Sequence, residues 1–277
     1  MRGRLILLFL LAAALLPQSG AEAKCAPRLV RGFGPYLARG AALPVTYPLP
    51  GQKSSRVSLE WFGHAFFRLM SPEGLRVLMD PFSYDRGYPV PPTNPHVVTI
   101  GKETPDHRGL EIVRGKPIVL RGLTNGGLEW GEVNRKVGDV RIASIPIMQG
   151  VAGYEHEFLT SFGKGAAFLF ETGGLCVAHL GDLAAPMNPS QLRRLGRVHV
   201  ALVVISEKVA MGPAAAAAFI RKLGPNVAIP MHFYDDAETL AIFLRKFKRI
   251  RRLPDRRLHL TRKTLPRPTE IVVLRHP

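Results

Sequence analysis

The order of secondary structure along the chain is the feature that most constrains its fold. From Arg56 to about residue 180, short β-branched and aliphatic runs are separated by Gly, Pro and Asn, which is typical of successive strands. From residue 188 onward, apolar strands alternate with helices. Strands followed by βα alternation indicate two sheets covered by helices. We therefore predict a sandwich of mixed α+β and α/β character, with four layers in the order αββα.

Three helices have recognisable ends in the second half of the chain. The first is predicted at residues 189–195, between Asn188 as its N-cap and Gly196 as its stop. The second is predicted at residues 213–223, because a proline opens it and a Gly-Pro pair ends it. The third is capped by an aspartate of the pair at 235–236. Its apolar residues share one face: Leu240, Phe243, Leu244 and Phe247.

The first 23 residues are typical of a secretory signal peptide. A positive n-region, MRGR, precedes the apolar run LILLFLLAAALLP, and Ala21-Glu22-Ala23 matches a cleavage site. The alternative is a membrane anchor, but the run is shorter than the roughly 20 residues that a span requires. We expect cleavage after Ala23 and a mature protein in the periplasm or outside the cell. Residues 24–55 form a Gly- and Pro-rich lead-in, and residues 56–277 form the domain.

The chain has two cysteines, Cys25 and Cys176. Lipidation of Cys25 is disfavoured, because Lys24 stands where a lipoprotein has a small residue. An oxidising compartment permits a single disulfide. However, Cys176 lies in the apolar run GLCVAHL, so the sequence favours a buried free thiol.

Positive charge is concentrated near the C-terminus. The formal net charge is +17, and residues 245–275 contain 12 Lys and Arg residues but only Asp255 and Glu270 as acids. Such a surface attracts anionic lipid, lipopolysaccharide or nucleic acid. The alternative is a face that is merely solvated. Export and the lack of interleaved aromatic residues argue against nucleic acid, which leaves an anionic envelope surface as the candidate partner.

Polar residues suited to metal binding stand at predicted strand ends. Hydrolytic metal sites use imidazoles and carboxylates around a cation that keeps a position for water. Each candidate is weak alone, because a single His or Asp at a strand end is usually structural. Their fixed order at successive strand-to-loop junctions strengthens the prediction of one site. The candidates are His64, Asp80, Asp106, His107, His179, Asp182 and His232.

These signatures together resemble the metallo-β-lactamase fold superfamily. The matching segments are WFGHAFFRL, RVLMDPF, VTIGKETPDH, HLGDL and VAIPMH, and the similarity runs from about Ser58 to the C-terminal EIVVLR. Within the superfamily, the chain is most similar to the L-ascorbate-6-phosphate lactonase-like hydrolases. The resemblance implies an αββα sandwich with its site along one edge.

The resemblance also implies that three metal ligands are replaced. Relatives carry the metal loop as H-x-H-x-D-H, and here its two early histidines become Lys102 and Thr104. The later histidine corresponds to Gln149. His156 is nearby and offers an alternative ligand, although the alignment does not favour it. All three altered positions belong to one metal of the pair, so that metal site looks deleted.

The ligands of the other metal are all present. The resemblance assigns them to Asp106, His107 and His232, with Asp182 as the shared ligand. We expect one divalent metal, zinc before manganese or iron, or no metal at all. Three further residues are expected beneath the site, where they hold the loop and orient ligands: His64, Asp80 and His179.

Lys102 has two interpretations. Loss of a cation leaves Asp106 and Asp182 facing each other, and an ammonium group in the vacated volume would offset their repulsion. We therefore place Lys102 with these two carboxylates in the catalytic group. The alternative is a lysine that points into solvent.

Three functions follow from these interpretations. The first is a mononuclear metal-dependent hydrolase of lactones, esters or phosphoesters, in which Asp182 orients water or takes its proton. The second is an inactive relative that binds a small-molecule or envelope ligand. The third is a membrane-surface protein recruited by charge.

Overall fold

The structure is a computed structural model that describes Cys25 and residues 54–89, 93–152, 159–206, 210–234 and 236–277. The predicted signal peptide, most of the lead-in and His156 lie outside these residues. Within the described ranges, no helix has the length and apolarity needed to cross a membrane.

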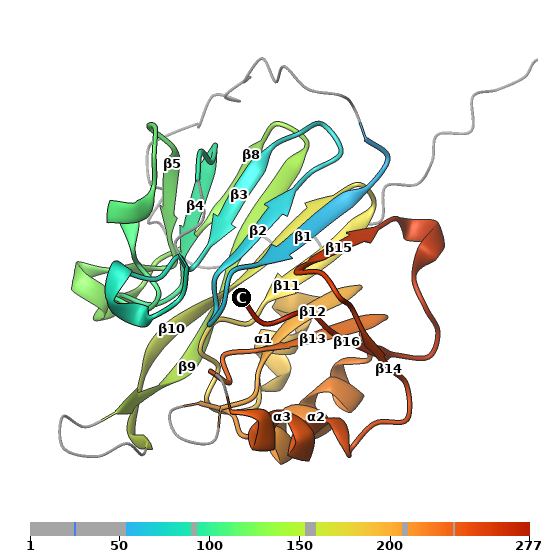
Figure 1. Cartoon of the computed structure of the whole chain (residues 1–277). Helices are drawn as coiled ribbons and strands as arrows, with labels where there is room; N and C mark the ends of the chain where they lie inside the picture. The colour runs from blue at the N-terminus through green and yellow to red at the C-terminus, as the bar shows by residue number, and fades with distance from the viewer. Residues whose placement is uncertain (1–24, 26–53, 90–92, 153–158, 207–209, 235) are drawn as a thin grey trace, which may run out of the picture.

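Two sheets pack face to face, which confirms the predicted sandwich (Figure 1). The first sheet has the strand order β15-β1-β2-β3-β4-β5. Its strands are β1 (Val57–Trp61), β2 (Phe67–Met70), β3 (Arg76–Met79), β4 (Val97–Ile100), β5 (Ile118–Arg121) and β15 (Arg257–Leu260). Late in the chain, β15 returns to pair antiparallel with β1.

The second sheet has the strand order β14-β16-β13-β12-β11-β10-β9-β8. Its strands are β8 (Asn134–Val137), β9 (Val140–Ala152), β10 (Leu159–Thr172), β11 (Leu175–His179), β12 (Val200–Val204), β13 (Val227–Met231), β14 (Ile250–Arg252) and β16 (Glu270–Val273). A separate two-stranded sheet pairs β6 (Leu123–Thr124) with β7 (Glu129–Trp130). The parallel strands β11, β12 and β13 are fully buried, as their apolar runs predict.

The three predicted helices form and lie over the second sheet (Figure 1). They are α1 (Pro189–Leu195), α2 (Pro213–Leu223) and α3 (Ala237–Leu244). Asn188 and Gln191 form a capping box at α1. At α3, Asp236 accepts a hydrogen bond from the Thr239 amide at 2.9 Å. The last helix ends before Phe247, which still packs against the core.

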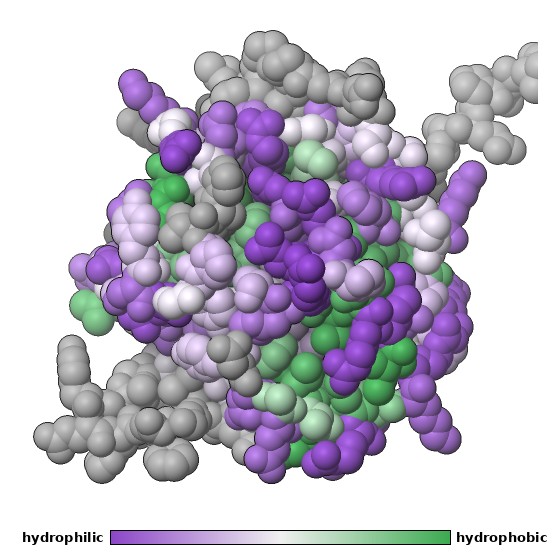
Figure 2. Space-filling view, in the orientation of Figure 1, coloured by the Kyte–Doolittle hydropathy of each residue, from purple (hydrophilic) through white to green (hydrophobic). Residues whose placement is uncertain are grey.

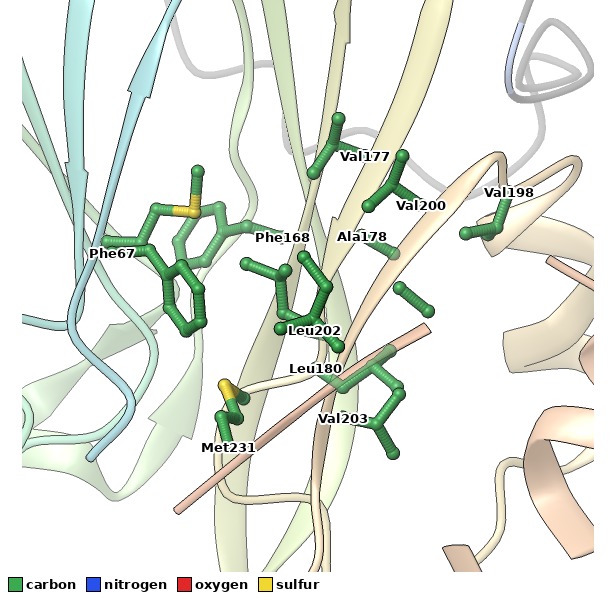
Figure 3. Packing of buried hydrophobic residues seen from close by; sticks show 14 of the residues in the cluster. Phe67, Phe168, Val177, Ala178, Leu180, Val198, Val200, Leu202, Val203 and Met231 are labelled. Atoms are coloured by element: carbon green, nitrogen blue, oxygen red, sulfur yellow. The ribbon is translucent and has the colours of Figure 1, made fainter. Parts of the chain in front are cut away.

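The main core fills the space between the sheets. Strand alternation sends Val77 and Met79 of β3 into this core, while Leu78 points to the other face. Figure 3 shows part of the core, with Phe67 from β2 and Phe168 and Leu202 from the second sheet.

The outer layer over the first sheet is built from loops and single 3-10 turns within the described residues. A small apolar cluster lies there: Phe62, Phe66, Leu78, Phe82, Val98, Ile100 and Ile112. The single turns of the chain are η1 (Tyr84–Arg86), η2 (Leu110–Ile112), η3 (Asn125–Gly127) and η4 (Arg262–Thr264). Beside the cluster the outer face is polar: buried Glu60 pairs with Arg68 and Arg257. The matching area of Figure 2 is mostly hydrophilic.

The preference for a buried free thiol is wrong. Cys25 and Cys176 form a disulfide with a Cα–Cα distance of 5.5 Å. The apolar run correctly placed Cys176 in the core, where its side chain is fully buried. It could not show that Cys25, 151 residues earlier, packs against the same strand. The sulfur of Cys25 is committed to this bond, so it is not a lipid acceptor.

Candidate metal centre

The predicted site residues meet at one edge of the sandwich. His64 follows β1, Asp80 follows β3, and Asp106 lies in the loop after β4. Asp182 follows β11 and His232 follows β13, so both sheets contribute. The backbone carbonyl of His64 joins the two sheets here. It accepts hydrogen bonds from the Trp61 indole at 3.0 Å and from the His232 amide at 3.2 Å.

The backbone is strained at this edge. Among the described residues, five non-glycine residues have positive φ, and four of them belong to the site. These are His64, Asp80, His232 and Tyr234, with φ of 48°, 44°, 63° and 49°. Left-handed backbone at bulky residues is uncommon and tends to mark functional sites. Asp80 and His232 come directly after strand ends, and His64 and Tyr234 come three residues after them. The turns there redirect the side chains into the site.

Four side chains form a group whose ligand atoms all lie within 4.8 Å of one another: His64, Asp106, His107 and His232. The Nε2 atom of His64 lies 3.3 Å from Asp106 Oδ2, and His107 Nε2 lies 3.7 Å from the same oxygen. His64 therefore reaches the ligand group itself, closer than the supporting position that the resemblance implies.

Asp80 orients His107 from beneath. His107 Nδ1 donates a hydrogen bond to Asp80 Oδ2 at 3.0 Å, which turns Nε2 toward the site. The Gly101 amide holds the other Asp80 oxygen at 2.8 Å. A Cβ atom on Gly101 would lie 2.4 Å from the Ala166 carbonyl and 3.1 Å from Asp80, so only glycine fits this approach. Asp80 thus fixes the metal loop and one imidazole together.

Lys102 points into the protein. Its Nζ lies 2.5 Å from Asp182 Oδ2 and 3.5 Å from the Gly150 carbonyl. The lysine is only 9% exposed and Asp182 only 2%. The ammonium group therefore occupies buried space beside Asp182, the carboxylate that the resemblance assigns as the shared ligand.

The other two altered positions are Thr104 and Gln149. Thr104 Oγ1 and Gln149 Oε1 are buried and have no hydrogen-bond partner among the described residues. Gln149 forms an isolated antiparallel bridge with Leu183, next to Asp182. Lys102, whose Nζ contacts the Gly150 carbonyl, and Gln149 therefore both lie near Asp182.

On the other side of Asp182, several donor atoms are left free. His107 Nε2, Asp182 Oδ1 and both ring nitrogens of His232 are buried and have no hydrogen-bond partner in the part of the chain that the structure describes. His232 Nε2 and Asp182 Oδ1 lie 3.3 Å apart. Buried polar atoms without partners are rare, so their convergence needs a reason. Imidazole nitrogens and carboxylate oxygens in this arrangement fit a divalent cation such as Zn²⁺, Mn²⁺ or Fe²⁺.

The titrating groups divide into opposite types. Burial opposes the charge of Lys102, but the carboxylates of Asp182 and Asp106 outweigh it and raise the lysine pKa. Burial likewise opposes the charge of Asp182, yet His232 and Lys102 lower its pKa. Burial and the neighbouring His64 hold the pKa of His232 well below its usual value. The lysine and the aspartate stay charged, while His232 stays neutral and able to bind metal.

His179 lies beneath the site but has no nitrogen to offer. Its Nε2 contacts the Ala65 carbonyl at 2.7 Å, and its Nδ1 accepts from the Gly181 amide at 3.3 Å. It also lies 4.0 Å from Asp80. The histidine supports the turn that carries Asp182.

Sequence reasoning missed Tyr234, which lies over the histidines. Its ring centroid is 5.2 Å from that of His64 and 5.8 Å from that of His232. Burial, with Asp106 and Asp182 nearby, raises its pKa to about 12. No local signal marked it, because its position over His64 depends on a segment far away in sequence.

Comparisons with known proteins agree with this fold. A family model described as a β-lactamase superfamily domain matches residues 58–232. A UPF0173 metal-dependent hydrolase from Methanoculleus marisnigri is 29% identical over 201 residues, covering 69% of this chain and 87% of the relative. A relative of the same description from Archaeoglobus fulgidus is 30% identical over 200 residues, covering 64% of this chain and 83% of its own.

A solved structure from Thermotoga maritima is also similar. Its description is a Zn-dependent hydrolase of the metallo-β-lactamase superfamily. It has a TM-score of 0.60 and 28% identity, and covers 79% of this chain and 98% of its own. The narrower resemblance to the ascorbate-6-phosphate lactonase branch stays a prediction. The matched family model, the sandwich and the site at its edge show that this chain belongs to the metallo-β-lactamase superfamily.

Proposed function

We propose that the protein is a metal-dependent hydrolase that works with a single metal ion. One observation carries this proposal: the Lys102 ammonium lies on one oxygen of Asp182, while the other oxygen faces unpartnered imidazole nitrogens. A tethered cation thus fills the deleted half of the site, and the kept half retains its donors. Relatives described as metal-dependent hydrolases support the reaction class.

The retained ligand residues are assigned to the metal. Asp106, His107 and His232 would hold the metal, and His64 lies close enough to join them or to steady Asp106. A metal ion bound there would polarise a substrate oxygen and lower the pKa of a water molecule.

Asp182 and Lys102 then act as a pair. The lowered pKa of Asp182 makes it a weak base, so its free Oδ1 positions water by accepting a hydrogen bond. Lys102 keeps Asp182 ionised and holds it in place.

The expected substrates are small lactones, esters or phosphoesters. A cleaved signal peptide would place the enzyme in the periplasm or outside the cell, where such compounds come from the envelope or the environment. The buried disulfide supports an oxidising compartment.

Metal content per chain tests the proposal. The mature protein is purified gently, analysed for bound transition metals, and compared with an Asp106→Ala/His232→Ala variant. We expect about one zinc, manganese or iron per wild-type chain and none in the variant, followed by hydrolysis in a screen of lactones and phosphoesters. A wild-type chain that takes up no metal from excess zinc would overturn the hydrolase and leave the fold as a metal-free binding protein.

We also propose that residues 245–275 bind an anionic envelope surface. Eleven of the twelve Lys and Arg residues there are exposed. Glu270 is already paired with Arg251, so little acidic charge offsets them.

A further inference from the structure

Tyr234 lies on the solvent side of the metal centre. Its side chain is 45% exposed, whereas His64 and His232, which its ring contacts, are 1% and 0% exposed. The phenol ring therefore contacts both buried histidines while part of it stays open to solvent.

The backbone is bent to put the ring there. His232 and Tyr234 both have left-handed φ, and Phe233 between them turns into the core. The Phe233 ring lies 5.5 Å from that of Trp61. Left-handed backbone costs free energy at a bulky residue and persists where its surroundings require it. Two such residues within three positions indicate that the placement of Tyr234 serves the site.

The hydroxyl of Tyr234 is not used to hold the fold. It makes no hydrogen bond to any residue that the structure describes. Tyr84 is a useful contrast, because its hydroxyl donates to the Glu111 carbonyl at 3.1 Å. The Tyr234 ring packs on two histidines and is partly exposed, and its hydroxyl group is available as a hydrogen-bond donor. This arrangement is suited to binding a ligand.

Such a donor would assist hydrolysis. Negative charge develops on a substrate oxygen in the transition state, and fixed donors aimed at that oxygen stabilise it. Lys102 cannot reach it, because its ammonium is buried against Asp182 and the Gly150 carbonyl. The free nitrogens of His107 and His232 face the metal position.

We propose that the Tyr234 hydroxyl donates a hydrogen bond to the substrate oxygen that becomes negatively charged. The same contact would bind the anionic oxygen of a phosphate or carboxylate product. This inference rests on the proposed function. It adds the Tyr234 hydroxyl to the single metal as a second group that stabilises negative charge on the substrate.

Binding of inorganic phosphate tests the contact without turnover. Zinc and then phosphate are titrated by calorimetry into wild type, Tyr234→Phe and the control Tyr84→Phe. The Tyr234→Phe change keeps the ring on the histidines and removes only the donor. We expect unchanged zinc affinity in all three proteins and phosphate affinity about tenfold lower in Tyr234→Phe alone. Equal phosphate affinity in wild type and Tyr234→Phe, or none in zinc-loaded wild type, would overturn the inference.

Kinetics with p-nitrophenyl phosphate provide the second readout. Because the donor acts on developing charge, Tyr234→Phe should lower kcat by about 100-fold and change KM much less. A rise in KM with kcat unchanged would overturn the transition-state role.

The two proposals fail in different ways. If wild type binds no zinc, the single-metal hydrolase is wrong, and the phosphate titration is repeated on the metal-free proteins. Weaker phosphate binding by Tyr234→Phe would still support the donor, and equal binding would overturn it as well.

Discussion

The Nζ atom of Lys102 lies 2.5 Å from Oδ2 of Asp182, and both groups are buried. Relatives that bind two metals place a cation on each side of this aspartate by resemblance. In the function proposed above, the Lys102 ammonium takes the place of one of these two cations and offsets part of the charge of Asp182.

Removing the lysine charge should move stability and metal affinity in opposite directions. In Lys102→Met the buried Asp182 loses its partner, so the free energy of unfolding of the metal-free protein should fall by about 3–5 kcal/mol. Zinc affinity should rise, because Asp182 gains a free oxygen and a nearby positive charge is gone. Chemical denaturation and zinc calorimetry measure the two effects. Lys136→Met, on an exposed lysine, is the control; a Lys102 variant that matches it in both assays would refute the replacement-cation role.

Restoring the three lost histidines should restore a second metal. We expect Lys102→His/Thr104→His/Gln149→His to bind two zinc ions per chain where wild type binds one. The reason is that Lys102 contacts Asp182, Gln149 pairs with Leu183 next to it, and Thr104 lies two residues from Lys102 in the chain. Elemental analysis gives the stoichiometry, and the corresponding triple alanine variant controls for the lost lysine. One zinc per chain in the histidine variant would show that the altered positions do not form a metal site.

Much of this site could be predicted because its residues follow strand ends. Strand runs and their polar termini are local features, and α1 and α2 have the predicted bounds for the same reason. The strands that were missed carry weak local signals. Both β8 and β14 are edge strands rich in Lys and Arg, and only pairing with their neighbours makes them strands.

Other features could not be read from local sequence. The Cys25–Cys176 disulfide, the burial of Lys102 and the position of Tyr234 over His64 each depend on chain segments far apart in sequence. The return of β15 to the first sheet is another long-range event, because RLHLT resembles any buried strand.

The disulfide should contribute strongly to stability. It links Cys25 to Cys176 across 151 residues and restricts the unfolded chain, so Cys25→Ser/Cys176→Ser should lower the free energy of unfolding by about 2–5 kcal/mol. Urea denaturation with and without reductant measures this effect. Reductant should destabilise wild type to the level of the variant and leave the variant unchanged. A wild type indifferent to reductant under unfolding conditions would show that the bond does not form.

His199 should make stability fall in mild acid. The ring is buried, its Nδ1 accepts from the Cys176 amide at 2.9 Å, and burial with Arg262, Arg197 and Arg267 lowers its pKa from 6.5 to about 4. Between these values the unfolded chain binds a proton that the folded chain does not. The effect of His199 on the free energy of unfolding is therefore nil above pH 6.5. It becomes a loss of about 3 kcal/mol near pH 4.

Comparison with His199→Asn isolates this effect, because asparagine can still accept from Cys176 but does not titrate. As the pH falls from 7 to 4.5, we expect the free energy of unfolding to decrease more in wild type than in His199→Asn. Parallel pH profiles would mean that His199 titrates normally in the folded protein.

Binding to anionic bilayers should depend on where the positive charge lies, not only on how much there is. Lys246, Lys248 and Arg252 are exposed residues of the basic region, and Lys246→Gln/Lys248→Gln/Arg252→Gln removes three charges. At about 1 kcal/mol per basic residue, partition onto phosphatidylglycerol vesicles should weaken by about 100-fold.

The matched control removes three exposed charges elsewhere, as Arg114→Gln/Lys116→Gln/Lys136→Gln. It should retain most of the vesicle binding, because charges far from the bilayer are screened within about 10 Å at 0.1 M salt.

Sedimentation with vesicles at rising salt measures both variants. Equal losses in the two variants would mean that net charge alone drives binding. Partition that is insensitive to salt would rule out electrostatic recruitment. Selective loss in the first variant, reversed at low salt, would place the binding surface around β14, two strands from β13, which carries His232 at its end.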